Sequence, residues 1–232
     1  LDWGYFDHPP MIALLIKLGY ALFPGELGVR LLPSLLGAGT FFLVLLILKD
    51  EVKDFRLLIL AALSIPLVHA HVAGFLAIPD LPLVFFGTLF FYFYKKYLEE
   101  DSLKMVLLLG LSIALMLYSK YHGFLVIGFT LLSNLKLLSR RSFWFVVGIS
   151  LLLYLPHILW QVKHDFVSFG YHLVDRNSPF KFSYLIEYIG NQILMFGPLT
   201  GVLLLYFGIA RKTENKFELA LKFNLIGFFL GF

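Results

Sequence analysis

Long apolar runs separated by short polar segments recur along this chain from residue 9 onward. About 20 apolar residues suffice to cross a bilayer, and a helix satisfies every backbone polar group inside lipid. The composition agrees: 59% of residues are hydrophobic and 15% are charged, against roughly 45–50% and about 25% in a soluble domain. The sequence therefore predicts an all-α, polytopic transmembrane helix bundle that forms a single domain over residues 1–232.

The apolar runs also predict where the crossings lie. We expect them at Leu27 to Leu48, Leu57 to Val72, Leu81 to Leu98, Met105 to Tyr118, Phe124 to Leu138, Phe143 to Trp160 and Tyr184 to Ala210. Pro9 to Phe23 is shorter and carries Lys17, which favours a helix in the membrane interface. Leu219 to Phe232 is too short to cross, and the chain does not begin with Met. We therefore expect a fragment that lacks material at both ends.

The basic residues orient these crossings. Four polar segments that alternation places on one side, 49–56, 95–104, 136–141 and 211–216, contain twelve Lys and Arg residues, against six in the opposite segments. The positive-inside rule makes the first side cytoplasmic. These residues form short clusters between apolar runs, so the basic pI of about 9.1 reflects topology and not binding to nucleic acid. The absence of Cys excludes disulfides and thiolate metal sites.

The histidines show a second asymmetry. In this topology all seven fall at or near extracytoplasmic helix ends, and none lies in a cytoplasmic segment. Several carboxylates share that side: Asp2, Asp7, Asp80, Asp165, Asp175 and Glu187. Although His is common at membrane interfaces, its placement on one side favours a functional surface on the extracytoplasmic face.

Candidate functional residues lie on this face. Asp7 and His8 precede the double proline at Pro9, and this acid and imidazole could bind a metal, hold a phosphate or orient a base. A helix-capping role explains them about equally well, and explains Asp80 somewhat better. Lys120 could neutralise a phosphate or anchor the turn at the membrane surface.

The polar segment from Gln161 to Ser183 adds further candidates. It contains Gln161, His164, His172 and Arg176. Any one of these residues taken alone is most often a solvated loop residue. The sequence has no zinc-binding helix motif and no glycine-rich phosphate loop.

Several blocks resemble, in order, a known family. They are Asp-Trp-Gly-Tyr-Phe-Asp-His-Pro-Pro-Met at residues 2–11, Val-Arg-Leu-Leu-Pro at 29–33, Pro-Asp-Leu-Pro-Leu at 79–83, Ser-Lys-Tyr-His-Gly at 119–123, and residues 184–198 with Gln192 and Gly197-Pro198. The chain is similar to dolichyl-phosphate-mannose protein mannosyltransferase-like enzymes, which are GT-C glycosyltransferases of family 39 and the aminoarabinose transferase-like group. The resemblance implies transfer of a sugar from a polyprenyl-phosphate-linked donor to a lipid, glycan or protein acceptor. It also implies a bacterial inner membrane with the active site on the periplasmic face.

The resemblance implies roles for the matching residues. Asp7 and Asp80 would be catalytic, although the family's main base is expected in an acidic pair upstream of Leu1, so residues 1–232 alone would be inactive. The residues expected to bind substrate or phosphate are His8, Lys120, Tyr121, His122, Gln192 and Arg176. Asp7 and His172 would hold a divalent metal if the enzyme uses one.

Two other classes of protein stay open at this stage. A polytopic transporter or lipid flippase would also have apolar helices, and Gly197-Pro198 could break one of them. Such a protein should carry ionisable residues near the middle of the bilayer, whereas these gather at one face. A noncatalytic membrane scaffold would explain the hydropathy but not the one-sided histidines.

Overall fold

The computed structural model describes residues 2–59, 76–172, 181–196 and 198–231, and every regular element in these ranges is helical. The elements are α1 (Met11–Leu22), α2 (Glu26–Leu48), α4 (Asp80–Glu99), α5 (Leu103–Ser119), α6 (Gly123–Ser133), the 3₁₀ helix η1 (Leu135–Ser139), α7 (Arg141–Lys163), α8 (Val167–Gly170), α9 (Phe182–Phe196), α10 (Pro198–Ala210) and α11 (Lys216–Gly231). The predicted all-α bundle is confirmed.

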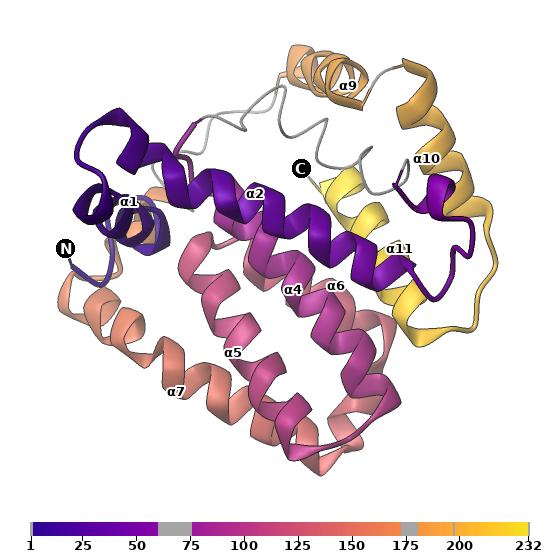
Figure 1. Ribbon diagram of the computed structural model, residues 1–232, viewed down its shortest axis with the longest axis horizontal. Coiled ribbons are helices and arrows are strands. Elements are labelled where there is room, and N and C mark those ends of the chain that lie inside the picture. Colours follow the sequence, from indigo (N-terminus) through magenta and orange to yellow (C-terminus); the bar gives the residue numbers. More distant parts are fainter. Residues whose placement is uncertain (1, 60–75, 173–180, 197, 232) are drawn as a thin grey trace.

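Helix α5 lies at the centre of the bundle. It packs between α4 and α7, while α2 covers α4 and α1 folds back against α2 (Figure 1). Helix α11 packs against α6 on the other side of α4. Met116, on α5, is fully buried, and the rings of Tyr94 and Tyr154 line the same core.

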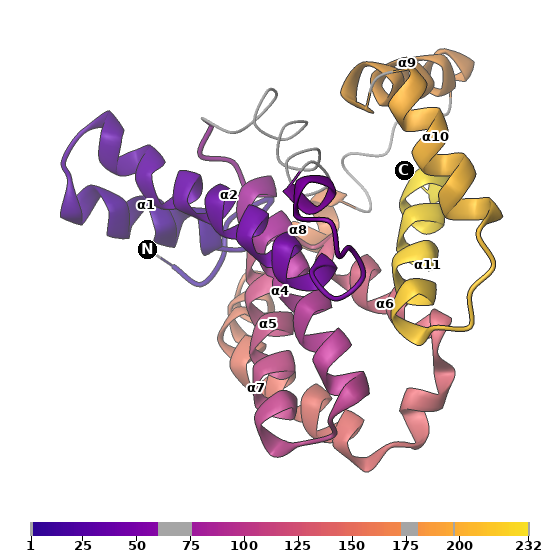
Figure 2. The same ribbon diagram turned by 45° about the vertical axis from the view of Figure 1, so that its right-hand side comes forward.

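Helices α1 and α2 form a tight hairpin (Figure 2). A Cβ atom built on Gly19 would lie 2.1 Å from the backbone oxygen of Gly28, and one on Gly28 would overlap the oxygen of Phe23. The two glycines therefore let the backbones approach, as small residues do where helices pack closely in membranes. This hairpin places the segment before α1 beside the end of α7.

The outer faces of the helices are apolar. Within the described part of the chain, α2 and α7 are long and apolar enough to cross a membrane, and α1, α5 and α6 are shorter apolar helices. Large apolar side chains such as Phe42, Phe145 and Leu152 are exposed on these outer faces. So much exposed apolar surface is typical of helices that face lipid and not water.

Two expected crossings differ from the structure, and a third is not tested. The untested one is Leu57 to Val72, most of which lies outside the described residues. The helix expected over Phe124 to Leu138 ends at Ser133, because Asn134 leaves the helical conformation, and η1 follows. The run from Tyr184 to Ala210 forms two helices, α9 and α10, and Pro198, which lacks an N–H, opens the second. Each is shorter than the roughly 20 residues of a full crossing.

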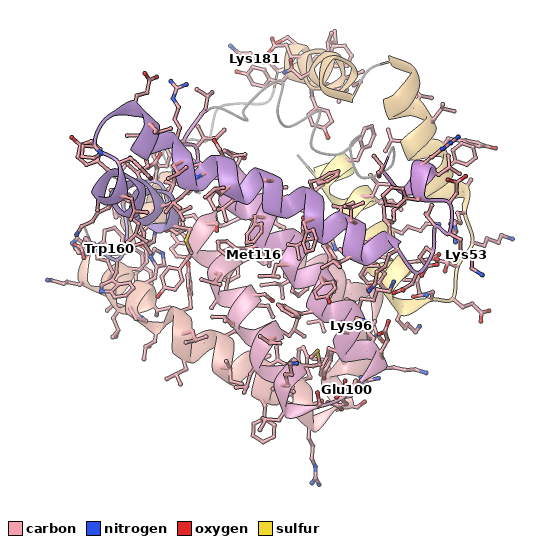
Figure 3. The ribbon with its side chains drawn as sticks, viewed as in Figure 1. Lys53, Lys96, Glu100, Met116, Trp160 and Lys181 are labelled. Carbon is pink, nitrogen blue, oxygen red and sulfur yellow. The ribbon has the colours of Figure 1, made fainter. Side chains whose placement is uncertain are left out.

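The two ends of the bundle carry different chemistry. At one end the Lys95 ammonium contacts the Ile47 carbonyl at 3.0 Å and the Glu51 carboxylate at 3.5 Å, joining the end of α2 to α4. Figure 3 shows Lys53, Lys96 and Glu100 toward this end, and Trp160 at the opposite margin of the molecule. The start of α4 and the ends of α5 and α7 lie at the Trp160 end, where the candidate residues gather.

Candidate functional site

Asp80 and Lys120 form an ion pair. The Lys120 ammonium lies 2.8 Å from the Asp80 carboxylate, although the two residues are 40 positions apart. Asp80 opens α4, and Lys120 follows α5, so the packing of these two helices brings the charges together. Asp80 lies within the described start of α4, whose N-cap is Pro79, and no side chain caps that helix. The Asp80 carboxylate therefore binds Lys120 and does not cap α4.

Asp7 and His8 form a second polar pair. The His8 Nδ1 atom lies 2.9 Å from the Asp7 carboxylate, and both side chains are partly exposed. Helix α1 begins after Pro10 without a side-chain cap in this described segment. Capping thus explains neither Asp7 nor His8, and their side chains are available at the surface.

Tyr121 is the centre of a buried hydrogen-bond network. Gln161 donates to the Tyr121 hydroxyl at 2.6 Å, and that hydroxyl lies 3.1 Å from His157 Nε2. His157 Nδ1 lies 2.6 Å from the Trp3 carbonyl, which can only accept, so Nδ1 carries the proton and Nε2 accepts from Tyr121. His157 and Gln161 are 1% and 2% exposed. Each hydrogen bond is therefore donated in the same direction, from Gln161 to Tyr121, from Tyr121 to His157, and from His157 to the Trp3 carbonyl before α1.

A second branch fixes the same segment further along. The second N–H of Gln161 donates to Ser168 at 2.8 Å, and the Ser168 hydroxyl donates to the Tyr5 carbonyl at 2.9 Å. His172 Nε2 donates to the Asp7 carbonyl at 2.8 Å. Three backbone carbonyls between Trp3 and Asp7 are therefore anchored to the region from α7 onward. This anchoring sets the position of the Asp7 and His8 side chains.

Gly4 allows this segment to approach α7. A Cβ atom at this position would lie 2.3 Å from the Trp160 ring. The indole also stacks on His164, with ring centroids 4.3 Å apart. The backbone between Trp3 and Tyr5 thus lies directly on an aromatic surface that only glycine can contact so closely.

The pKa of Tyr121 depends on its burial and on a few neighbouring side chains. Burial raises the pKa of the Tyr121 hydroxyl, and the nearby Asp7 charge acts in the same direction. The neighbouring Ser168 and Gln161 side chains oppose these effects. Because burial dominates, Tyr121 stays a neutral donor and acceptor at physiological pH.

The described histidines gather at one end of the bundle. The His8 and His172 rings lie 6.2 Å apart, Tyr121 contacts both His157 and His172, and Trp160 stacks between His157 and His164. His122 occupies the N-cap position of α6, in the same turn as Tyr121. His69, His71 and Arg176 lie outside the described residues, as does the side chain of Gln192.

The metal assignment to Asp7 and His172 stays a prediction. No three His, Cys, Asp or Glu side chains within the described ranges come close enough to form a metal site. His172 uses Nε2 to donate to a carbonyl, so in the neutral ring Nδ1 would be the ligating atom. The residues present supply two candidate ligand groups and fit a tightly held resident metal poorly.

Sequence reasoning treated Gln161 as an ordinary loop residue, and the structure corrects this. Helix α7 continues through Lys163 and buries Gln161. The available signal was spacing: His157, Trp160, Gln161 and His164 occur at i, i+3, i+4 and i+7, which places them on one helix face. Ser168 gave no comparable signal.

The comparisons with known proteins agree with this geometry. The family model described as dolichyl-phosphate-mannose-protein mannosyltransferase matches residues 7–160. No curated protein and no solved structure matches the chain. The matched range contains Asp7, His8, Asp80, Lys120 and Tyr121. Because the match covers well over half of the chain, this protein belongs to the dolichyl-phosphate-mannose-protein mannosyltransferase family and is an integral membrane glycosyltransferase.

Proposed function

We propose that this protein transfers a sugar from a polyprenyl-phosphate-linked donor to an acceptor on the extracytoplasmic face of a bacterial inner membrane. The observation that carries the proposal is the convergence of two polar pairs, Asp80 with Lys120 and Asp7 with His8, around the Tyr121 turn at one end of an apolar bundle. Residues 1–232 would contribute one transmembrane domain to the enzyme.

The chemistry of such a transfer needs the groups found there. When the glycosidic bond breaks, the leaving phosphate keeps the bonding electrons, and a nearby cation stabilises its charge. Lys120 supplies that cation, and Asp80 holds its ammonium in place from the start of α4. A carboxylate must also take the acceptor's proton, and the family resemblance places that base upstream of Leu1. Asp7 lies at the surface, partly exposed and next to His8, where it could orient the acceptor for that base.

The membrane setting supports the same assignment. A polyprenyl tail keeps the donor in the bilayer, so its phosphate lies at the interface, where a helix end meets water. Asp80, Lys120 and the segment before α1 all occupy helix ends. The basic segments that the positive-inside rule assigns to the cytoplasm include Lys53 and Lys96, which lie toward the other end (Figure 3).

The test removes each carboxylate with little change in shape. Asp7→Asn and Asp80→Asn should each reduce sugar transfer by the full-length protein in membrane vesicles to a small residual rate, measured with a labelled polyprenyl-phosphate sugar. Glu100→Gln, at the opposite end of the bundle, is the matched control and should keep wild-type transfer. Expression and thermal unfolding of all three variants should resemble the wild type. Unchanged transfer by both aspartate variants would overturn the site assignment.

A further inference from the structure

An open groove of about 450 Å³ lies on the outer side of α7, where the chain's first described residues meet this helix. One wall is apolar and includes Leu152, Leu155 and Leu159. Its polar end is formed by Asp2, Trp160 and Lys163. Trp160 lies at the margin of the molecule in Figure 3. Because Leu152 and Leu159 are exposed, the groove opens onto the outer face of α7.

The apolar wall has the length of one bilayer leaflet. Leu152 and Lys163 are eleven positions apart on one helix, which corresponds to about 16 Å of axial rise. Half of the hydrocarbon core is about 15 Å. Leu152 and Leu159 are 69% and 60% exposed, so this wall has no protein cover among the described residues. It can thus contact one lipid chain from the interface toward the middle of the bilayer.

Trp160 places a fixed hydrogen-bond donor at the polar end. Its side chain is 8% exposed, and its indole is held between the His164 ring and the backbone at Gly4. Its Nε1 atom nevertheless has no hydrogen-bond partner among the described residues. The Asp2 carboxylate is near enough for this N–H to help lower the Asp2 pKa, after the larger effect of the Trp3 backbone N–H. The Asp2 and Trp160 atoms do not meet in hydrogen-bonding geometry, so the donor still lacks an acceptor.

Two opposite charges lie near the Trp160 N–H and do not pair with each other. Lys163 is close enough to affect the pKa of Asp2, but these two described residues form no ion pair. Both side chains belong to exposed residues that line the groove. The polar end therefore offers an anion, a cation and a directional N–H donor to the same ligand.

We propose that this groove binds a zwitterionic bilayer phospholipid whose head group carries a phosphate and a primary ammonium. The phosphate accepts from the Trp160 N–H and faces Lys163, the ammonium faces Asp2, and one acyl chain follows Leu152, Leu155 and Leu159. An anionic head group would leave Asp2 facing negative charge without a counterion. The proposal requires only the membrane setting and not the transfer reaction.

Native mass spectrometry of the purified, delipidated full-length protein tests this proposal. Phosphatidylethanolamine and phosphatidylglycerol with identical acyl chains are titrated separately. We expect the ethanolamine lipid to bind at about tenfold lower concentration, the scale of one favourable charge contact at an interface. Asp2→Asn should abolish this preference. Trp160→Phe, which keeps the ring but removes the N–H, should weaken both lipids about equally.

Controls keep each result interpretable. Lys163→Gln alters an exposed side chain and should weaken both phospholipids, so the proposal stays testable if Trp160→Phe does not fold. Lys104→Gln removes an exposed Lys from the start of α5 and should change nothing. Equal binding of the two lipids to the wild type, or a preference that survives Asp2→Asn, would overturn the proposal. So would one-for-one displacement of the bound lipid by a polyprenyl phosphate, since it would assign the groove to the sugar donor.

Discussion

Replacing Lys120 with Met should affect the transfer rate far more than stability. The Lys120 and Asp80 side chains are 21% and 42% exposed, and so accessible a pair contributes about 0.2–1 kcal/mol to folding. Its loss should lower the melting temperature by only about 0.4–4 °C for a chain of this size. If Lys120 also stabilises the leaving phosphate, losing its charge should lower the rate about 10²–10³-fold, as removal of one transition-state donor typically does.

The assay combines initial transfer rates in vesicles with thermal unfolding in detergent. Lys120→Arg keeps the charge and should retain far more activity than Lys120→Met. Asp80→Asn leaves the Lys120 ammonium in place but unanchored. The double variant should therefore lose less transfer activity than the losses of Asp80→Asn and Lys120→Met combined. A rate within threefold of wild type for Lys120→Met, or activity that falls only in proportion to folded protein, would refute the phosphate role.

Three other substitutions probe how the site is held. Gly4→Ala should destabilise the protein by about 1–3 kcal/mol, because its Cβ overlaps the Trp160 ring. Gly148→Ala, at a helical site with no atom within 4 Å of the added Cβ, should not destabilise it. Chemical unfolding of both variants measures the difference. Ser168→Ala leaves the Tyr5 carbonyl and one Gln161 N–H without their partner, which should cost about 1–3 kcal/mol and speed hydrogen exchange before α1. Ser139→Ala, at the exposed end of η1, should be nearly silent. Burial raises the Tyr121 pKa above its usual 10.0, so the stability linked to this group is complete below pH 10.0 and is lost as pH rises toward the pKa of the folded state. Tyr121→Phe should therefore make the alkaline fall in melting temperature shallower. An unchanged slope would show that Tyr121 ionisation does not cause this fall.

The helices that the sequence predicts best are bounded by charges. The expected run from Leu27 to Leu48 becomes α2, which begins one residue earlier, and the run from Leu81 to Leu98 becomes α4, extended by one residue at each end. Hydropathy succeeds there because the burial cost of a charge ends the apolar segment abruptly. It fails at the end of α7, because Gln161 is polar yet buried, and its hydrogen bonds allow the helix to continue.

The sequence predicts which residues form the candidate site, but not how those residues are arranged in space. Asp7, His8, Asp80 and Lys120 are visible in sequence because they interrupt or border apolar runs. That Lys120 meets Asp80 depends on helix packing, and the contact from His157 to Trp3 joins residues 154 positions apart. Local periodicity carries no information at that separation, and capping rules assign Asp80 a different role.

The residues that we propose take part in the reaction and those that position them lie in different parts of the sequence. The family match ends at residue 160, and it includes both polar pairs. Three side chains just beyond it, Gln161, Ser168 and His172, donate to Tyr121 and to the carbonyls of residues 5 and 7. Those carbonyls belong to the backbone that carries Asp7, so Gln161, Ser168 and His172 hold that backbone in place beside α7 and the residues that follow it. If Asp7 acts as proposed, loosening this anchoring should lower kcat while leaving the charges intact, since misplaced catalytic groups lose rate before they lose binding.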